Sequence, residues 1–134
     1  MRESLTLSVS IACDWQQAYE AVWQPQDFQR WASGLSQSHL EREDTGWWRT
    51  QGPDGPIRIR FSEHNAFGVM DHYVDLGNGL EIYVPMRIVE NADGAEVLFT
   101  LFRQADMTDD KFAEDVAWVE RDLGELKALL ERSV

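Results

Sequence analysis

Cysteine is almost absent from this chain of 134 residues, and its single cysteine, Cys13, cannot form an internal disulfide. No run of about 18 apolar residues occurs, which argues against a membrane-spanning helix. An apolar segment after a basic start, as in a secretory signal peptide, is missing as well. These absences predict a cytoplasmic protein without structural disulfides.

Basic residues are half as frequent as acidic residues. Twelve Lys and Arg stand against 24 Asp and Glu, and the formal net charge is −12. A protein with this charge is repelled by the phosphate backbone of nucleic acids and by the anionic face of a membrane. We therefore expect no nucleic-acid partner and no membrane insertion.

Motifs of the common cofactor enzymes are also missing. The sequence contains no phosphate-binding loop, no dinucleotide-binding glycine pattern and no nucleophile elbow. Its three histidines, His39, His64 and His72, do not occur at the spacing of metal ligands. We expect neither a metal ion nor a cofactor.

Aromatic residues, in contrast, are plentiful. The chain has six Trp, six Phe and three Tyr, and 43% of its residues are hydrophobic. This composition is enough for one core, and a typical domain holds about 100 to 200 residues. We therefore expect a single domain over residues 1–134.

The first part of the chain predicts one strand and two short helices. Residues 5–11 alternate between apolar and polar side chains, as in a half-buried strand. Asp14 is a typical N-cap for a short amphipathic helix. Pro25 must interrupt this helix, because proline removes a hydrogen bond and clashes one turn back. A second short helix should then carry Trp31 inward and end at Gly34.

The remainder predicts a sheet followed by a long helix. Turn residues divide residues 37–104 into six strands joined by hairpins. Residues 108–132 carry apolar side chains at spacings of three and four, which predicts a helix about 36 Å long. The fold class is α+β: a curved seven-stranded antiparallel sheet that grips the C-terminal helix. A curved sheet and one helix diverge at one end, so we expect a cavity between them.

Four segments resemble a known superfamily. Residues 18–31 (AYEAVWQPQDFQRW) resemble the helix, break and tryptophan after the first strand of the START/Bet v 1-like (SRPBCC) helix-grip superfamily, in particular its bacterial polyketide cyclase/dehydrase-like branch. Residues 68–72 (GVMDH), 84–87 (VPMR) and 94–102 (GAEVLFTLF) extend the resemblance over nearly the whole chain. It implies a ligand cavity, since known members bind lipids, hormones, polyketides or quinones, and a few catalyse aromatic ring closure.

The last hairpin allows its faces to be assigned. If residues 91–94 form a four-residue turn, Met86 faces Phe99 and Val84 faces Leu101. All four side chains then lie on one face of the sheet. We expect this face to line the cavity.

Two charged residues beside the cavity have two interpretations each. Arg103 follows on the inner face and could anchor an acidic ligand, or it lies at the surface where the strand ends. Asp115 flanks the apolar stripe of the final helix, as Asp122 does, and could reach the cavity as a hydrogen-bond acceptor or remain solvated. Trp118 on the same helix is a candidate for covering the sheet edge or for a homodimer contact.

The facing of residues 69–75 stays open at this stage. Pairing with the preceding strand places His72 inside, whereas pairing with the following strand places Asp71 and Tyr73 inside. We favour His72, because its neighbours are more apolar. An inward His72 is a candidate general acid or base, with Asp71 and Tyr73 as candidate partners in catalysis.

We expect a module that binds a hydrophobic or aromatic small molecule, lipid-, polyketide- or quinone-like, between the sheet and the final helix. One alternative is a polyketide cyclase or dehydratase-like enzyme that uses His72. Another is a protein-interaction module resembling the Hsp90-activator branch of the same fold. The residues expected to line the ligand site are Trp31, Trp48, Phe61, Met70, Val84, Met86, Phe99, Leu101, Arg103, Phe112, Asp115, Val116 and Val119.

Overall fold

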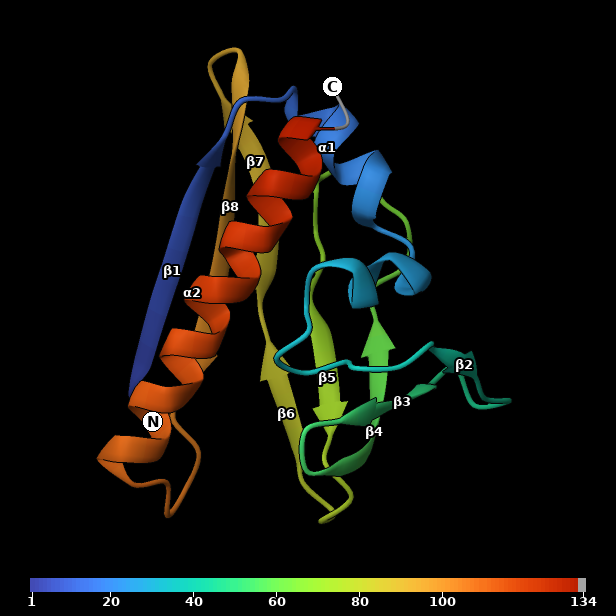
Figure 1. Cartoon of the computed structure of the whole chain (residues 1–134), viewed down its shortest axis with the longest axis vertical. Helices are drawn as coiled ribbons and strands as arrows, with labels where there is room; N and C mark the ends of the chain where they lie inside the picture. Colours follow the sequence, from blue (N-terminus) through green and yellow to red (C-terminus); the bar gives the residue numbers. More distant parts are fainter. Residues whose placement is uncertain (133–134) are drawn as a thin grey trace.

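The computed structural model describes residues 1–132 and places one long helix against one face of a curved antiparallel sheet (Figure 1). The elements follow in the order β1 (Ser4–Ile11), α1 (Trp15–Val22), η1 (Pro25–Arg30), β2 (Glu41–Arg42), β3 (Trp48–Gly52), β4 (Gly55–Phe61), β5 (His72–Asp75), β6 (Glu81–Val84), β7 (Met86–Asn91), β8 (Gly94–Phe102) and α2 (Asp109–Arg132). The α+β grip predicted from the sequence is confirmed. No helix of these residues is both long and apolar enough to cross a membrane.

The strands form two sheets that meet at a bend in the chain. One sheet has the order β1-β8-β7 and the other β2-β3-β4-β5-β6. Only Pro85 separates β6 from β7, and proline has no N–H for a ladder hydrogen bond. One of the six strands expected within residues 37–104 is therefore divided, and residues 1–132 form eight strands where seven were expected.

The segment before β5 joins the two sheets along the free edge of β7. Ile88 N donates to Gly68 O and Met70 N donates to Met86 O, each at 2.9 Å. Gly68 has a φ of +69°, and a Cβ at this position would lie 2.0 Å from the Ile88 carbonyl oxygen. Only glycine allows the two backbones to approach so closely.

The two short helices follow β1 as predicted, with one difference in where the second ends. The Asp14 carboxylate accepts hydrogen bonds from the backbone N–H groups of Gln16 and Gln17 at 3.1 Å and caps α1. Pro25 begins η1, a 3-10 helix, which ends at Arg30. The predicted end at Gly34 is wrong, because the N–H of Gly34 is directed at Asp122 of α2.

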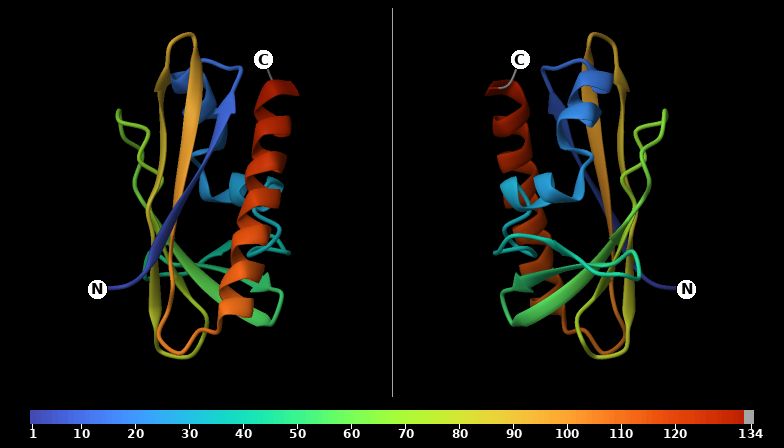
Figure 2. Two further views of the ribbon diagram at one scale, coloured as in Figure 1. Left: turned by 90° about the vertical axis from the view of Figure 1, so that its left-hand side faces the viewer. Right: turned by 90° about the vertical axis from the view of Figure 1, so that its right-hand side faces the viewer.

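The register of β7 and β8 agrees with the prediction, but the predicted pairing of Val84 with Leu101 is wrong, because Val84 belongs to β6 and pairs with His72. Met86 pairs with Phe99 and Ile88 pairs with Val97 across the hairpin. These side chains are buried beneath α2 and α1. Figure 2 shows α2 crossing this side of the sheet along β1, with which it makes its main contacts.

The core is packed unevenly along α2. At the closed end, beside α1, Leu123, Leu126 and Leu130 are at most 2% exposed (Figure 1). At the other end, which we call the open end, some inward side chains are only half-buried: Phe112, Val116 and Val119 on α2, and Trp48, Phe61, Ile82 and Leu101 on the sheet. Other inward side chains of the same strands, those of Ile57, Ile59 and Val74, are at most 5% exposed.

Candidate functional site

His72 lies at the start of β5 and points to the inner face of the sheet, where it is 1% exposed. It pairs with Phe61 of β4 on one side and with Val84 of β6 on the other. The turn from β5 to β6 spans residues 76–80, and this odd number of residues reverses the facing expected from a two- or four-residue turn. Of the two alternatives that the sequence left open, the structure therefore has His72, and not Asp71 and Tyr73, on the inner face.

Aromatic rings surround His72. The Phe28 ring lies 5.3 Å from the His72 ring and 5.2 Å from the rings of Trp31 and Phe61, centroid to centroid. The Phe99 ring lies 6.0 Å from His72 on another side. We call these five residues the aromatic cluster. It draws on η1, β4, β5 and β8, and so depends on the whole fold.

Two polar atoms of the aromatic cluster have no hydrogen-bond partner within residues 1–132. They are the indole Nε1 of Trp31 and the imidazole Nε2 of His72, and both are buried. His72 Nδ1 lies 3.1 Å from the carbonyl oxygen of Met70. Leaving a buried donor or acceptor unpaired costs roughly 1 to 3 kcal/mol. The two atoms are therefore a marked departure from ordinary core packing.

Burial also determines the charge of His72. Because water cannot reach the ring, the charged form is disfavoured and the pKa of His72 is lowered to about 4. The Met70 carbonyl can only accept a hydrogen bond, so the neutral ring carries its proton on Nδ1. His72 Nε2 then presents a lone pair to the interior.

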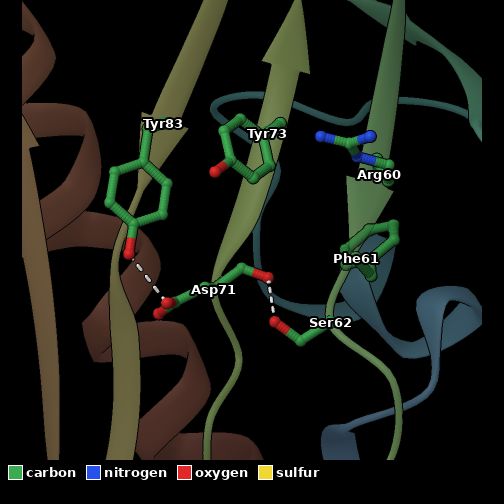
Figure 3. A pocket seen from close by; sticks show the side chains of 6 residues that line it. All are labelled: Arg60, Phe61, Ser62, Asp71, Tyr73 and Tyr83. Atoms are coloured by element: carbon green, nitrogen blue, oxygen red, sulfur yellow. Dashed lines mark hydrogen bonds between the residues drawn. The ribbon is translucent and has the colours of Figure 1, made fainter.

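The structure separates Asp71 and Tyr73 from His72. Both lie on the outer face, in a pocket of about 280 Å³ that also involves Arg60 and Tyr83 (Figure 3). The carboxylate of Asp71 accepts hydrogen bonds from the Tyr83 hydroxyl at 2.8 Å and from the backbone N–H of Met86 at 2.9 Å. It also pairs with the Arg87 guanidinium. Asp71 thus holds the bend between β6 and β7.

Arg60 stacks between two rings on this outer face. Its guanidinium lies 5.2 Å from the centroid of Trp47 and 4.8 Å from that of Tyr73. The Tyr73 ring is in turn 5.1 Å from Tyr83. Trp47, the residue before β3, therefore faces outward, whereas Trp48 of β3 pairs with the buried Ile59 and faces inward.

Arg103 and Asp115 are not brought to the aromatic cluster. Arg103 donates to the carbonyl oxygen of Met107 at 2.7 and 3.1 Å and pairs with Asp109 at 2.7 Å, which fastens the turn from β8 to α2. Asp115 pairs with Lys111 at 2.7 Å, one turn earlier on α2. Both interactions are internal to the β8–α2 region.

Asp122, which the sequence placed beside the apolar stripe of the final helix as either a buried acceptor or a solvated carboxylate, is 7% exposed and therefore buried. Each of its carboxylate oxygens lies 3.3 Å from the backbone nitrogen of Gly34. Burial raises the pKa of Asp122 to about 6, although the Gly34 N–H favours the charged form. The partner is 88 residues away in sequence, so no local pattern could have indicated it.

A second surface pocket, of about 390 Å³, lies between α1 and the loop before β5. His64 contributes to it and places Nε2 2.7 Å from a carboxylate oxygen of Glu20. The His64 ring also contacts Tyr19 and Trp23. No group of three or more His, Cys, Asp and Glu within residues 1–132 could hold a metal ion.

Comparison with known proteins identifies the fold. No protein-family model and no curated protein matches the sequence. Among solved structures, Ara h 8.0201 superposes with a TM-score of 0.68 at 9% identity, covering 97% of this chain and 98% of that chain. The Aha1 dimer from Colwellia psychrerythraea gives 0.71 at 14% identity, covering 96% of each chain.

A third structure comes from a biosynthetic locus. DynU16, of the dynemicin biosynthetic locus, superposes with a TM-score of 0.73 at 18% identity, and the match covers 98% of this chain but 48% of DynU16. The three likenesses, at such low identities, show the fold. The chain has the Bet v 1-like helix-grip fold, which the four quoted segments predicted.

Proposed function

We propose that this protein binds a hydrophobic or aromatic small molecule, lipid-, polyketide- or quinone-like, between the sheet and the N-terminal half of α2. The supporting observation is the open end of the grip, where the inward residues Phe112, Val116 and Val119 are only half-buried. Apolar surface that faces inward but remains in contact with water is unfavourable. A ligand that covers this surface would be stabilised by its burial.

The lining suits a neutral, apolar ligand. Inward residues of the open end are aliphatic or aromatic on both the sheet and the helix. The nearest charged candidates, Arg103 and Asp115, are already engaged with Asp109 and Lys111. Small-molecule sites commonly combine an apolar lining with a few polar groups, and here the aromatic cluster supplies the polar groups.

The catalytic alternative receives less support. A general acid or base works best with a pKa near the operating pH, whereas burial lowers the pKa of His72 to about 4. Its candidate partners, Asp71 and Tyr73, line the outer pocket. We therefore assign His72 to binding rather than to proton transfer.

One observation favours a partner surface as a second function. The outer face of the sheet carries a row of stacked side chains formed by Trp47, Arg60, Tyr73 and Tyr83. Tyr83 is 38% exposed. Aromatic residues and arginine are enriched at protein interfaces. Substituting Tyr83 by Ala should weaken such a partner interaction and leave small-molecule binding unchanged.

The ligand-binding proposal can be tested with apolar probes and a matched pair of variants. Saturating 2-methylnaphthalene should raise the melting temperature and change the tryptophan fluorescence, because a ligand that binds only the folded state stabilises it. Val116→Glu, on the inward face of α2, should abolish both effects. Ala117→Glu, on the exposed face of the same turn, should preserve them. Equal binding by both variants would contradict the proposal.

A further inference from the structure

The two unpartnered atoms of the aromatic cluster have opposite requirements. The indole Nε1 of Trp31 can only donate a hydrogen bond. His72 Nε2 can only accept one, because Nδ1 holds the proton against the Met70 carbonyl. A group that satisfies both must donate to one atom and accept from the other.

Trp31 and His72 share one aromatic neighbour. Both rings pack against the ring of Phe28, at centroid distances of 5.2 and 5.3 Å. The Phe61 ring, 6.0 Å from His72, is half-buried, and Phe61 also lines the outer pocket. A molecule that covers Phe61 therefore comes directly to the edge of the aromatic cluster.

We propose that the ligand of this site is an apolar molecule with a neutral hydroxyl group, which donates a hydrogen bond to His72 Nε2 and presents its oxygen to Trp31 Nε1–H. This inference rests on the proposed function and specifies the ligand class. The observation that supports it is that both atoms are buried and have no hydrogen-bond partner within residues 1–132.

Other polar groups fit the pair less well. A ketone, ether or quinone oxygen accepts from Trp31 but has no proton for His72. A carboxylate has the same defect when charged, and its burial among aromatic rings without a cationic partner would be costly. A hydroxyl is the smallest neutral oxygen group that meets both requirements.

Matched probes test the hydroxyl directly. 2-Naphthol and 2-methylnaphthalene have nearly the same shape and differ by one hydroxyl, while 2-methoxynaphthalene keeps the oxygen but lacks the donor. We expect 2-naphthol to bind at least about tenfold more tightly than the other two, which is the gain from pairing buried polar groups. Without such pairing, 2-naphthol would bind more weakly, because its hydroxyl would lose its hydration.

Two variants test whether His72 causes the preference for 2-naphthol. His72→Leu removes the acceptor and keeps an apolar side chain of similar size, so the preference for 2-naphthol should fall at least about fivefold. His64→Gln removes an exposed histidine that lies outside the aromatic cluster, and should preserve the full preference. As a measurement that needs no variant, the ¹⁵N resonance of His72 Nε2 should shift with 2-naphthol and not with 2-methylnaphthalene.

The outcomes separate this inference from the proposed function. If the three probes bind with equal affinity, the proposed function stands and the hydroxyl assignment is overturned, since a retained water molecule must then satisfy both atoms. If the ¹⁵N resonance of His72 Nε2 does not change when 2-naphthol binds, the hydroxyl assignment is likewise overturned. If no probe binds, both proposals fail.

Discussion

The two halves of α2 carry the same spacing of apolar residues but differ in burial. In the C-terminal half, Leu123, Leu126 and Leu130 are at most 2% exposed. In the N-terminal half, Phe112 and Val116 occupy equivalent positions and are only half-buried. An amphipathic pattern thus indicates which face of a helix points inward, but it does not indicate how closely the sheet approaches that face.

Polar contacts fasten the C-terminal half to the sheet. Lys127 Nζ donates to the carbonyl oxygen of Ser10 at 2.7 Å, and the Glu131 carboxylate accepts from the backbone N–H of Ala12 at 2.9 Å. These contacts join α2 to the end of β1. The N-terminal half lies on the side of the bend at Pro85 where the second sheet diverges (Figures 1 and 2). We infer that the closed end provides stability and the open end provides binding surface.

The largest effect that distinguishes the two ends should come from truncating their side chains. Leu126→Ala creates a cavity at the closed end, and we expect it to lower the free energy of unfolding by about 2 to 5 kcal/mol. Val116→Ala, at the open end, should cost less than about 1 kcal/mol, because its side chain is already in contact with water. Urea denaturation measures both free energies of unfolding. Equal decreases in the two variants would contradict the inference that the closed end provides stability and the open end provides binding surface.

The free energy of unfolding at acidic pH should depend on His72, the buried histidine near the open end. The pKa of His72 is about 4 in the folded protein against an ordinary 6.5, so the unfolded chain binds the proton more tightly. Its contribution to stability is therefore lost as pH falls from about 6.5 to 4. The free energy of unfolding of His72→Leu, measured relative to that of the wild type, should therefore be about 2 kcal/mol higher at pH 5 than at pH 7.

A pH-independent difference between His72→Leu and the wild type would contradict this prediction. His64→Gln is the control, because His64 is on the surface and half-exposed. Replacing His64 should leave the pH dependence of unfolding close to that of the wild type.

A smaller effect of opposite sign should come from Asp122 on α2. Its pKa is about 6 in the folded protein against an ordinary 3.8, so the folded state binds the proton more tightly. This group therefore lowers stability as pH rises from about 4 to 6. Asp122→Asn should be more stable relative to the wild type at pH 7 than at pH 5, by about 1 kcal/mol. A relative stability that instead increases toward pH 5 would show that the carboxylate is not buried.

Local sequence patterns predicted the elements and the register of one hairpin. Met86 was matched with Phe99 because a four-residue turn determines the pairing of its strands. The division at Pro85 could have been anticipated from the missing N–H. The facing of His72 could not be determined, since it depends on whether the β5–β6 turn has an even or odd number of residues.

The site was less predictable than the fold. His72 and Trp31 were both named as candidates, but their relation through Phe28 requires that η1 and β5 come together in space. Their unpartnered atoms are properties of the packed interior, which no periodicity reports. The burial of Asp122 depends in the same way on Gly34.

The ligand should bind at the open end and not at the closed end or on the outer face. The most direct test is a methyl NMR titration of the wild-type protein with 2-naphthol. We predict that the methyl resonances of Val116, Val119 and Leu101 shift, while those of Leu126 and Leu130 stay in place. Shifts confined to Leu126 and Leu130, or no methyl shifts at saturation, would contradict the account.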